Sequence, residues 1–229
     1  MKISGFQKMT LLDFPSKVAC TIFTAGCNFR CGFCHNAALV THIDNETQYS
    51  VDEVLNYLSK RKGILEGVCI TGGEPLLQAG IEDFLRKVKE LGFLVKLDTN
   101  GSFPKKLKSL VAEGLVDYVA MDIKNSREKY NFTADCEINI ADIEESIAFL
   151  MSGAVDYEFR TTVVKEYHNI EDMKAIGEWI KGAKNYFLQN FVDSGDLIKD
   201  GLSAVNSTEL YKMQEILSGF VVKTEIRGI

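Results

Sequence analysis

Three closely spaced cysteines are the first residues in this sequence that could do chemistry. Residues 26–36 read Gly-Cys-Asn-Phe-Arg-Cys-Gly-Phe-Cys-His-Asn, so Cys27, Cys31 and Cys34 follow a Cys-x3-Cys-x2-Cys spacing. A loop of this length can wrap three thiolates around one metal centre. Iron–sulfur clusters usually take four cysteine ligands. A cubane held by only three would leave one iron open to a substrate or cofactor, as in open catalytic metal sites.

Other interpretations of the cysteines stay open at this point. A structural zinc site could combine the three thiolates with His35, although zinc sites usually draw a second ligand pair from far along the chain, and no second Cys-x2-Cys occurs. The three thiols could also be buried or redox-active without a metal. Cys20, Cys69 and Cys136 are isolated, and the first two lie in apolar runs where we expect small buried core residues.

Glycine and charged residues follow three later apolar runs. The motifs are Thr71-Gly72-Gly73-Glu74-Pro75, Asp98-Thr99-Asn100-Gly101 and Asp122-Ile123-Lys124. Glycines permit a close backbone approach, and a carboxylate with an ammonium could hold the two charges of a zwitterionic ligand. The simpler explanations are a tight turn for the glycines, an Asn-Gly turn for the second motif and an exposed ion pair for the third.

Short apolar segments that alternate with amphipathic ones must position these motifs. Strands are predicted at 18–23, 68–71, 93–97, 118–121, 159–164, 186–188 and 220–226. Helices are predicted from Ser50 toward Arg61 and at 78–91, 104–113, 142–152, 170–181 and 207–218. This alternation predicts parallel β/α units with right-handed crossovers, either as an open or partly closed barrel of six units or as a doubly wound sheet. In both architectures ligands bind at the carboxyl ends of the strands, where the motifs lie.

The composition is typical of a packed globular protein. The chain has 229 residues, of which 46% are hydrophobic and 25% charged, and 26 Lys and Arg against 32 Asp and Glu give a net charge of −6. That balance argues against a general nucleic-acid-binding or anionic-membrane surface. Apolar runs fall far short of the roughly 20 residues of a membrane span, and we recognise no signal peptide. We therefore expect a cytoplasmic protein with reduced thiols.

Taken together, the motifs resemble one family. The cysteine motif with Phe33 before its third cysteine, followed by His35-Asn36 and later by the Gly-Gly-Glu turn, is similar to the radical S-adenosylmethionine (SAM) superfamily. The Asp98–Gly101 and Asp122–Lys124 motifs narrow the resemblance to activating enzymes of glycyl radical enzymes. The opening Leu11-Leu12-Asp13-Phe14-Pro15 looks most similar to the anaerobic ribonucleoside-triphosphate reductase activating proteins, and pyruvate formate-lyase activating enzyme is the nearest relative in motif content.

This resemblance extends over about residues 15–200 and implies a fold. We expect an α/β protein with a partial (β/α)6 barrel of the radical SAM type, as a single domain over residues 1–229. Its core would span about 15–200, and a C-terminal helix and strand would lie at about 201–229.

The resemblance also implies cofactors, a reaction and partners. Cys27, Cys31 and Cys34 would hold a 4Fe-4S cluster whose fourth iron is chelated by the amino and carboxylate groups of SAM. After reduction by a flavodoxin or ferredoxin-type donor, SAM would be cleaved to methionine and a 5′-deoxyadenosyl radical. That radical would take a hydrogen atom from a glycine of a partner glycyl radical enzyme, with anaerobic ribonucleotide reductase the expected partner. No nucleic acid or membrane is expected as a partner.

Carried over residue by residue, the resemblance implies a binding site but no catalytic residue beyond the cluster and SAM. The residues expected to contact SAM are Phe33, Gly72, Gly73, Glu74, Asp98, Lys124, Arg160 and Gln189. Asp98, Thr99 and Asp122 could in addition bind a monovalent cation. Arg160 lies inside an apolar strand pattern and must have a partner or face a polar cavity, with a structural salt bridge as the alternative. His35 is expected to structure the loop, and His42 and His168 belong to no constellation.

Two other functions are kept as alternatives. One is a radical SAM enzyme that acts on a small molecule, similar to 7-carboxy-7-deazaguanine synthase. The other is a metal-binding interaction module without catalysis.

Overall fold

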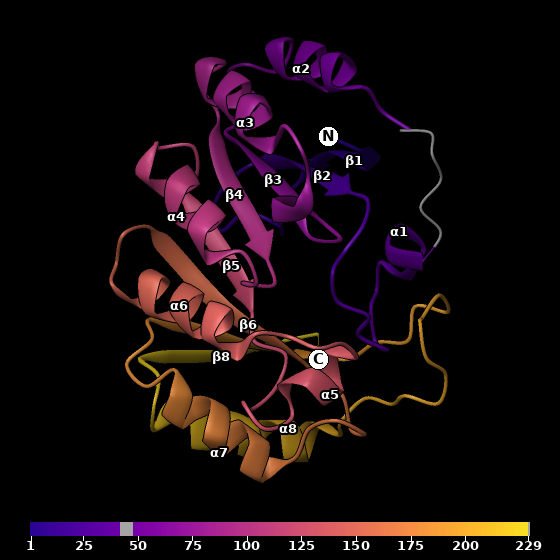
Figure 1. Ribbon diagram of the computed structural model, residues 1–229, viewed down its shortest axis with the longest axis vertical. Helices are drawn as coiled ribbons and strands as arrows, with labels where there is room; N and C mark the ends of the chain where they lie inside the picture. Colours follow the sequence, from indigo (N-terminus) through magenta and orange to yellow (C-terminus); the bar gives the residue numbers. More distant parts are fainter. Residues whose placement is uncertain (42–47, 229) are drawn as a thin grey trace. The chain divides into compact units, whose positions relative to one another are not determined.

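The computed structural model describes residues 1–41 and 48–228 (Figure 1). Its strands are β1 (Ile3–Thr10), β2 (Ala19–Thr24), β3 (Gly67–Gly72), β4 (Leu94–Thr99), β5 (Tyr118–Asp122), β6 (Asp156–Val163), β7 (Asn185–Asn190) and β8 (Lys223–Arg227). Its helices are α1 (Ala37–Thr41), α2 (Val51–Ser59), α3 (Ile81–Glu90), α4 (Pro104–Ala112), α5 (Tyr130–Ala134), α6 (Ile140–Met151), α7 (Ile170–Trp179) and α8 (Ser207–Ser218), with a 3-10 turn, η1, at Pro75–Leu77.

The strands form an open, mostly parallel sheet in which they follow one another in chain order from β1 to β8. β2, β3 and β4 pair in parallel, and so do β6, β7 and β8. The α/β prediction with six β/α units is thereby confirmed for β2 to β7, and the doubly wound alternative is wrong, because its strand order would reverse partway. β1 was not predicted, and it pairs with β2 in the antiparallel direction.

The chain packs as two compact units. The first comprises Met1–Asn28, Ala38–Thr99 and Phe103–Val119. The second comprises Phe29–Ala37, Asn100–Ser102 and the described residues from Ala120 onward.

The first unit has a sheet with one apolar face. Val68 pairs with Val95, and Ile70 with Leu97, and all four side chains are fully buried. The helix α3 packs against β4 and against α2. α2 begins where the sequence predicted, since Ser50 and Glu53 form a reciprocal capping box.

Because side chains alternate along a strand, the opposite face of the same strands carries a different set of residues. Thr21, Cys69 and Lys96 stand side by side in the register of β2, β3 and β4. Asp98, two residues after Lys96, lies on this same face. The strands are buried on both faces, as predicted, but one face is polar.

The strands of the second unit also have one apolar face and one polar face. Phe159 pairs with Tyr186 on a buried face of β6 and β7, and α8 packs against β7 and β8. On the other face, Arg160 stands beside Phe187, and Gln189 beside Arg227. Each unit therefore reserves one face of its strands for polar side chains.

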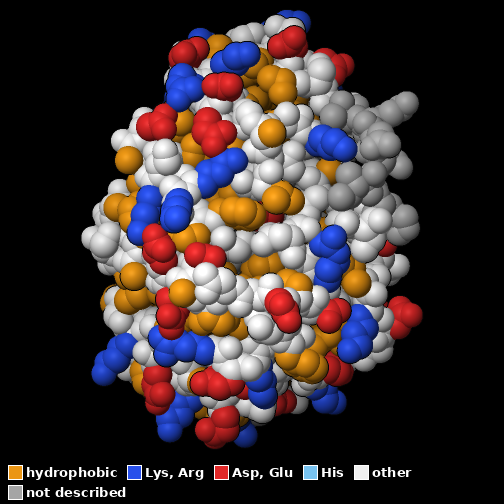
Figure 2. Space-filling model, viewed as in Figure 1, with side chains coloured by type: hydrophobic (Ala, Val, Ile, Leu, Met, Phe, Trp, Pro, Cys, Tyr) orange, Lys and Arg blue, Asp and Glu red, His pale blue; other side chains and the backbone are white. Residues whose placement is uncertain are grey.

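One face of the molecule mixes the two signs of charge (Figure 2). In the face shown in Figure 2, basic and acidic side chains are interspersed. Over the part of the chain that the structure describes, no helix combines the length and apolar character that a membrane span requires.

Candidate functional site

The cysteine loop connects the two units along the chain. Cys27 belongs to the first unit, whereas Cys31 and Cys34 belong to the second. None of the three forms a disulfide bond, and Cys31 is buried while the other two are half-buried. Cys20 and Cys69 are fully buried core residues, as predicted, and burial raises the pKa of the Cys20 thiol to about 12.

Backbone hydrogen bonds fix the part of the loop that lies in the second unit. The Arg30 amide donates to the carbonyl oxygen of Ala134 at 2.9 Å, and the Gly32 carbonyl accepts from the Lys199 amide at 3.0 Å. A Cβ atom at Gly32 would lie 2.9 Å from the Tyr167 hydroxyl oxygen and 2.8 Å from the Lys199 Cβ. Glycine between the second and third cysteines is thus required by close packing.

Phe33 places an aromatic ring between the loop and the motif after β5. Its side chain is buried, with its ring centroid 5.7 Å from that of Tyr167. The Lys124 ammonium lies 5.9 Å from the centre of the Phe33 ring, within reach of a cation–π interaction. His35 is exposed and packs near Phe191, and partial burial together with the Lys124 charge lowers its pKa.

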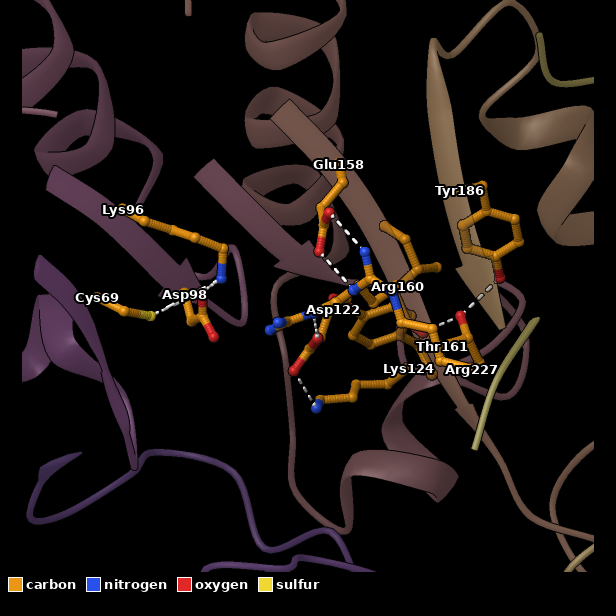
Figure 3. A network of polar contacts seen from close by, with 12 residues as sticks. Cys69, Lys96, Asp98, Asp122, Lys124, Glu158, Arg160, Thr161, Tyr186 and Arg227 are labelled. Atoms are coloured by element: carbon orange, nitrogen blue, oxygen red, sulfur yellow. Dashed lines mark hydrogen bonds and ion pairs between the residues drawn. The ribbon is translucent and has the colours of Figure 1, made fainter. Parts of the chain in front are cut away.

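Lys124, Asp122 and Arg160 form an ion-paired cluster at the end of β5 (Figure 3). The Asp122 carboxylate accepts from the Lys124 Nζ at 3.0 Å through Oδ2 and from the Arg160 Nε at 3.0 Å through Oδ1. Burial opposes ionisation of Asp122, but the positive charges of Arg160 and Lys124 lower its pKa to about 2. Of the two possibilities for Arg160, a partner or a polar cavity, the structure shows a partner, Asp122.

The charge on Lys124 also acts on the cysteine loop. Burial disfavours the ammonium, but the negative charges of Asp122 and of Cys31 raise its pKa above the ordinary range. Burial raises the pKa of the Cys34 thiol, and Lys124 opposes that rise. A fixed cation thus lies where it stabilises thiolates of the loop.

A buried histidine that the sequence gave no reason to single out holds the backbone of Lys124. His168 is 3% exposed; its Nδ1 accepts from the Val164 amide at 3.1 Å, and its Nε2–H donates to the Lys124 carbonyl at 2.8 Å. Burial lowers the pKa of this imidazole, which keeps it neutral. Asn125 fixes the same turn, because its Nδ2 donates to the Tyr167 carbonyl at 3.0 Å.

A second ion pair, also unforeseen, lies on the polar face of β6 and β8. Glu158 is 1% exposed, and its carboxylate accepts hydrogen bonds from both terminal nitrogens of Arg227, at 2.9 and 3.0 Å (Figure 3). The Arg227 guanidinium stacks 3.5 Å from the centre of the Phe187 ring. Gln189, predicted to contact SAM, is half-buried beside Arg227 in the register.

In the first unit, the Gly72–Gly73 turn lies against the residue that precedes Cys27. Gly72 has φ +111°, a backbone conformation that favours glycine. A Cβ at Gly73 would lie 2.0 Å from the Gly26 carbonyl oxygen. No larger side chain fits this approach, so the cysteine loop and the turn depend on each other's backbone.

The Glu74 side chain stabilises the same turn through hydrogen bonds. It is fully buried, and its Oε1 accepts from the Leu76 amide at 3.0 Å and from the Thr99 hydroxyl at 2.8 Å. The Glu74 backbone contacts the cysteine loop as well, because its amide donates to the Gly26 carbonyl at 2.8 Å.

Asp98 lies beside Lys96, a residue that sequence reasoning missed (Figure 3). Lys96 is 2% exposed, and its Nζ pairs with the Asp98 carboxylate.

Among the described residues, no three side chains of His, Cys, Asp or Glu surround a point where a single metal ion could bind. His42 lies outside the described residues.

The donor set fits an iron–sulfur cluster. Three thiolates in one loop are the soft ligands that such a cluster takes, and the Lys124 cation acts on two of them. The close Gly73–Gly26 approach gives the loop a rigid support beside its first cysteine.

Comparison with known sequences agrees with this chemistry. The profile of the Radical SAM superfamily matches residues 21–180, and the chain belongs to this superfamily. A protein of Methanocaldococcus jannaschii, provisionally named a glycyl-radical enzyme activating enzyme, is 30% identical over 234 residues, which cover 99% of this chain and 96% of that protein. The GTP 3′,8-cyclase of Helicobacter pylori is 35% identical over 175 residues, which cover 72% of this chain and 51% of the cyclase.

Solved structures show the same fold. SuiB of Streptococcus suis bound to S-adenosylmethionine superposes with a TM-score of 0.70 at 14% identity, covering 90% of this chain and 49% of SuiB. A domain of pyruvate-formate lyase-activating enzyme from Bacteroides vulgatus gives a TM-score of 0.57 at 19% identity, covering 71% of this chain and 99% of that domain. The radical SAM family implies a 4Fe-4S cluster and SAM, but the comparisons give no support to a monovalent cation.

Proposed function

We propose that this chain is a radical SAM activase that abstracts a hydrogen atom from a glycine of a partner glycyl radical enzyme. The observation that carries the proposal is the end-to-end match with the Methanocaldococcus protein, which covers 99% of this chain and 96% of that one. Anaerobic ribonucleotide reductase is the partner that we infer, and a flavodoxin or ferredoxin-type protein is the electron donor. We place this anaerobic reaction in the cytoplasm.

Cys27, Cys31 and Cys34 would hold the cluster, which when bound supplies the electron for cleavage of SAM. Lys124 holds a positive charge beside the thiolates and is oriented by Asp122 through its side chain and by His168 through its backbone. An ammonium in this position can bind the SAM carboxylate as a charge-assisted contact. Gly72 and Gly73 would bring backbone groups to the methionine end of SAM.

Arg160 and Gln189, two of the remaining predicted contacts, lie on the polar face of the second unit. Arg160, ion-paired to Asp122, would reach the SAM carboxylate, and Phe33 and Gln189 would contact the nucleoside. Asp98 in the first unit would accept from the SAM ammonium. The protein thus orients SAM and excludes water, while the cofactor does the difficult chemistry.

The test is anaerobic incubation of the reconstituted protein with SAM, a reductant and anaerobic ribonucleotide reductase from the same cell. Electron paramagnetic resonance should show a glycine-centred doublet on the partner. The doublet should disappear when the partner's glycine is replaced by Ala. SAM cleavage without any radical on a glycyl radical enzyme of that cell would count against the activase.

A second candidate is a radical SAM enzyme that modifies a small molecule. The 35% identity to a GTP 3′,8-cyclase favours it, although this chain accounts for only 51% of the cyclase. The same incubation with GTP, and with the substrate of 7-carboxy-7-deazaguanine synthase, in place of the partner decides between the two. A modified nucleotide or pterin found by mass spectrometry would support the second candidate.

A further inference from the structure

The charge on Asp98 is already matched by a cation that belongs to the protein. Lys96 precedes it by two residues on β4, so both side chains lie on the polar face of the first unit. The Lys96 ammonium pairs with Oδ1 of Asp98, and the side chains are 2% and 13% exposed. The Cys69 sulfur lies 3.8 Å from the Lys96 Nζ and 3.8 Å from the Asp98 Oδ1 (Figure 3).

Burial makes this pair obligatory. A lysine ammonium removed from water is costly unless an opposite charge and hydrogen bonds accompany it. Val95 and Leu97, its neighbours along β4, are fully buried on the other face of the strand. Lys96 therefore depends on Asp98 as its anion, and Asp98 has a permanent cation within contact.

Thr99 and Asp122, the other two residues expected to bind a monovalent cation, also have hydrogen-bond or ion-pair partners within the protein. The Thr99 hydroxyl donates to Glu74 at 2.8 Å. Within the second unit, Asp122 accepts from Lys124 and from Arg160, both at 3.0 Å. Both carboxylates are therefore already paired with cations of the protein, and a free Na⁺ or K⁺ at Asp98 would meet the repulsion of Lys96 without the further contacts that would hold the SAM ammonium there.

We propose that the Lys96 ammonium takes the place of a monovalent cation at Asp98, so that this protein binds and cleaves SAM without K⁺ or Na⁺. The inference rests on the proposed function, because it concerns the same SAM site. It replaces the expectation that Asp98, Thr99 and Asp122 bind a cation.

The test compares buffers of equal ionic strength made with tetramethylammonium, sodium or potassium chloride. For the reconstituted full-length protein, SAM affinity and the rate of SAM cleavage should agree within twofold in all three. In Lys96→Met, which keeps an unbranched chain but removes the charge, SAM affinity should differ at least tenfold between tetramethylammonium and K⁺ or Na⁺. Lys96→Arg, which keeps the charge, should stay indifferent to the cation.

A matched control removes another partly buried lysine of the first unit. Lys89 is 25% exposed and pairs with Asp117 at 2.6 Å. Lys89→Met should show the cation independence of the unmodified protein. If Lys89→Met also responded to K⁺ or Na⁺, the response of Lys96→Met would reflect the loss of a lysine charge in general and not a particular role of Lys96.

A readout without SAM separates this inference from the proposed function. A cation that binds only the folded state raises the unfolding midpoint, so K⁺ should raise the midpoint of Lys96→Met relative to tetramethylammonium but leave the unmodified protein unchanged. This result would support the role of Lys96 even if no buffer gave SAM cleavage, in which case the proposed function fails alone. The inference is overturned if K⁺ or Na⁺ stimulates the unmodified protein tenfold or more, or if a folded Lys96→Met responds to no cation in either readout.

Discussion

Replacement of His168 tests how the site is positioned. His168 is only 3% exposed. In His168→Leu, the Val164 amide loses its acceptor and the Lys124 carbonyl loses its donor. Each buried polar group left without a partner costs about 1–3 kcal/mol, so we expect the loss of two partners to lower the free energy of unfolding by about 2–6 kcal/mol. That is a large share of the roughly 5–15 kcal/mol that stabilises a typical domain.

The control is His168→Gln, whose side chain offers one acceptor and one donor at a comparable reach. Its free energy of unfolding should fall by less than half as much as that of His168→Leu. Urea unfolding of the protein, followed by circular dichroism, measures both losses. Because the Lys124 backbone is anchored by this imidazole, SAM should also bind more weakly to the reconstituted Leu variant than to the Gln variant. Equal stability of the Leu variant and the unmodified protein would refute the reasoning.

The remaining predictions concern charge and ligation. Since the folded-state pKa of His168 lies below its ordinary value of 6.5, stability is complete above about pH 6.5 and is lost as the pH falls below it; His168→Gln should flatten this loss in unfolding curves taken from pH 7.5 to 5. Lys124→Met should keep its iron but bind SAM about 10- to 150-fold more weakly by calorimetry, the value of one charge-assisted contact; unchanged affinity would remove Lys124 from the site. Cys31→Ala should lose the cluster absorbance and SAM cleavage, whereas Cys136→Ala should keep both, and equal loss in the two would contradict the three-ligand assignment.

The strands that carry the motifs were predictable because they are short apolar runs with polar ends. The six predicted runs between 18 and 188 match β2 to β7 to within a few residues at each end. β1 was missed because Ile3–Thr10 contains Gly5 and the exposed polar residues Gln7 and Lys8, and its pairing with β2 includes register shifts. Its antiparallel pairing depends on β2, which no local pattern reveals.

The charged residues inside strands were the part that could not be predicted. Lys96 and Glu158 interrupt apolar runs, and only the pairing register shows that each lies on a polar face with a partner. Arg160 was different, because an isolated arginine in an apolar strand required a partner, and Asp122 is that partner. His168 is bound to backbone groups, and a contact of that kind leaves no signature in the sequence.

The most direct test of the activase assignment follows the hydrogen atom itself. Anaerobic ribonucleotide reductase labelled with deuterium on the α-carbon of its glycines is incubated with the reconstituted protein, SAM and reductant, and the 5′-deoxyadenosine product is analysed by mass spectrometry. We predict 5′-deoxyadenosine that carries one deuterium. Abundant 5′-deoxyadenosine without deuterium, formed while the labelled partner is present and folded, would contradict the assignment.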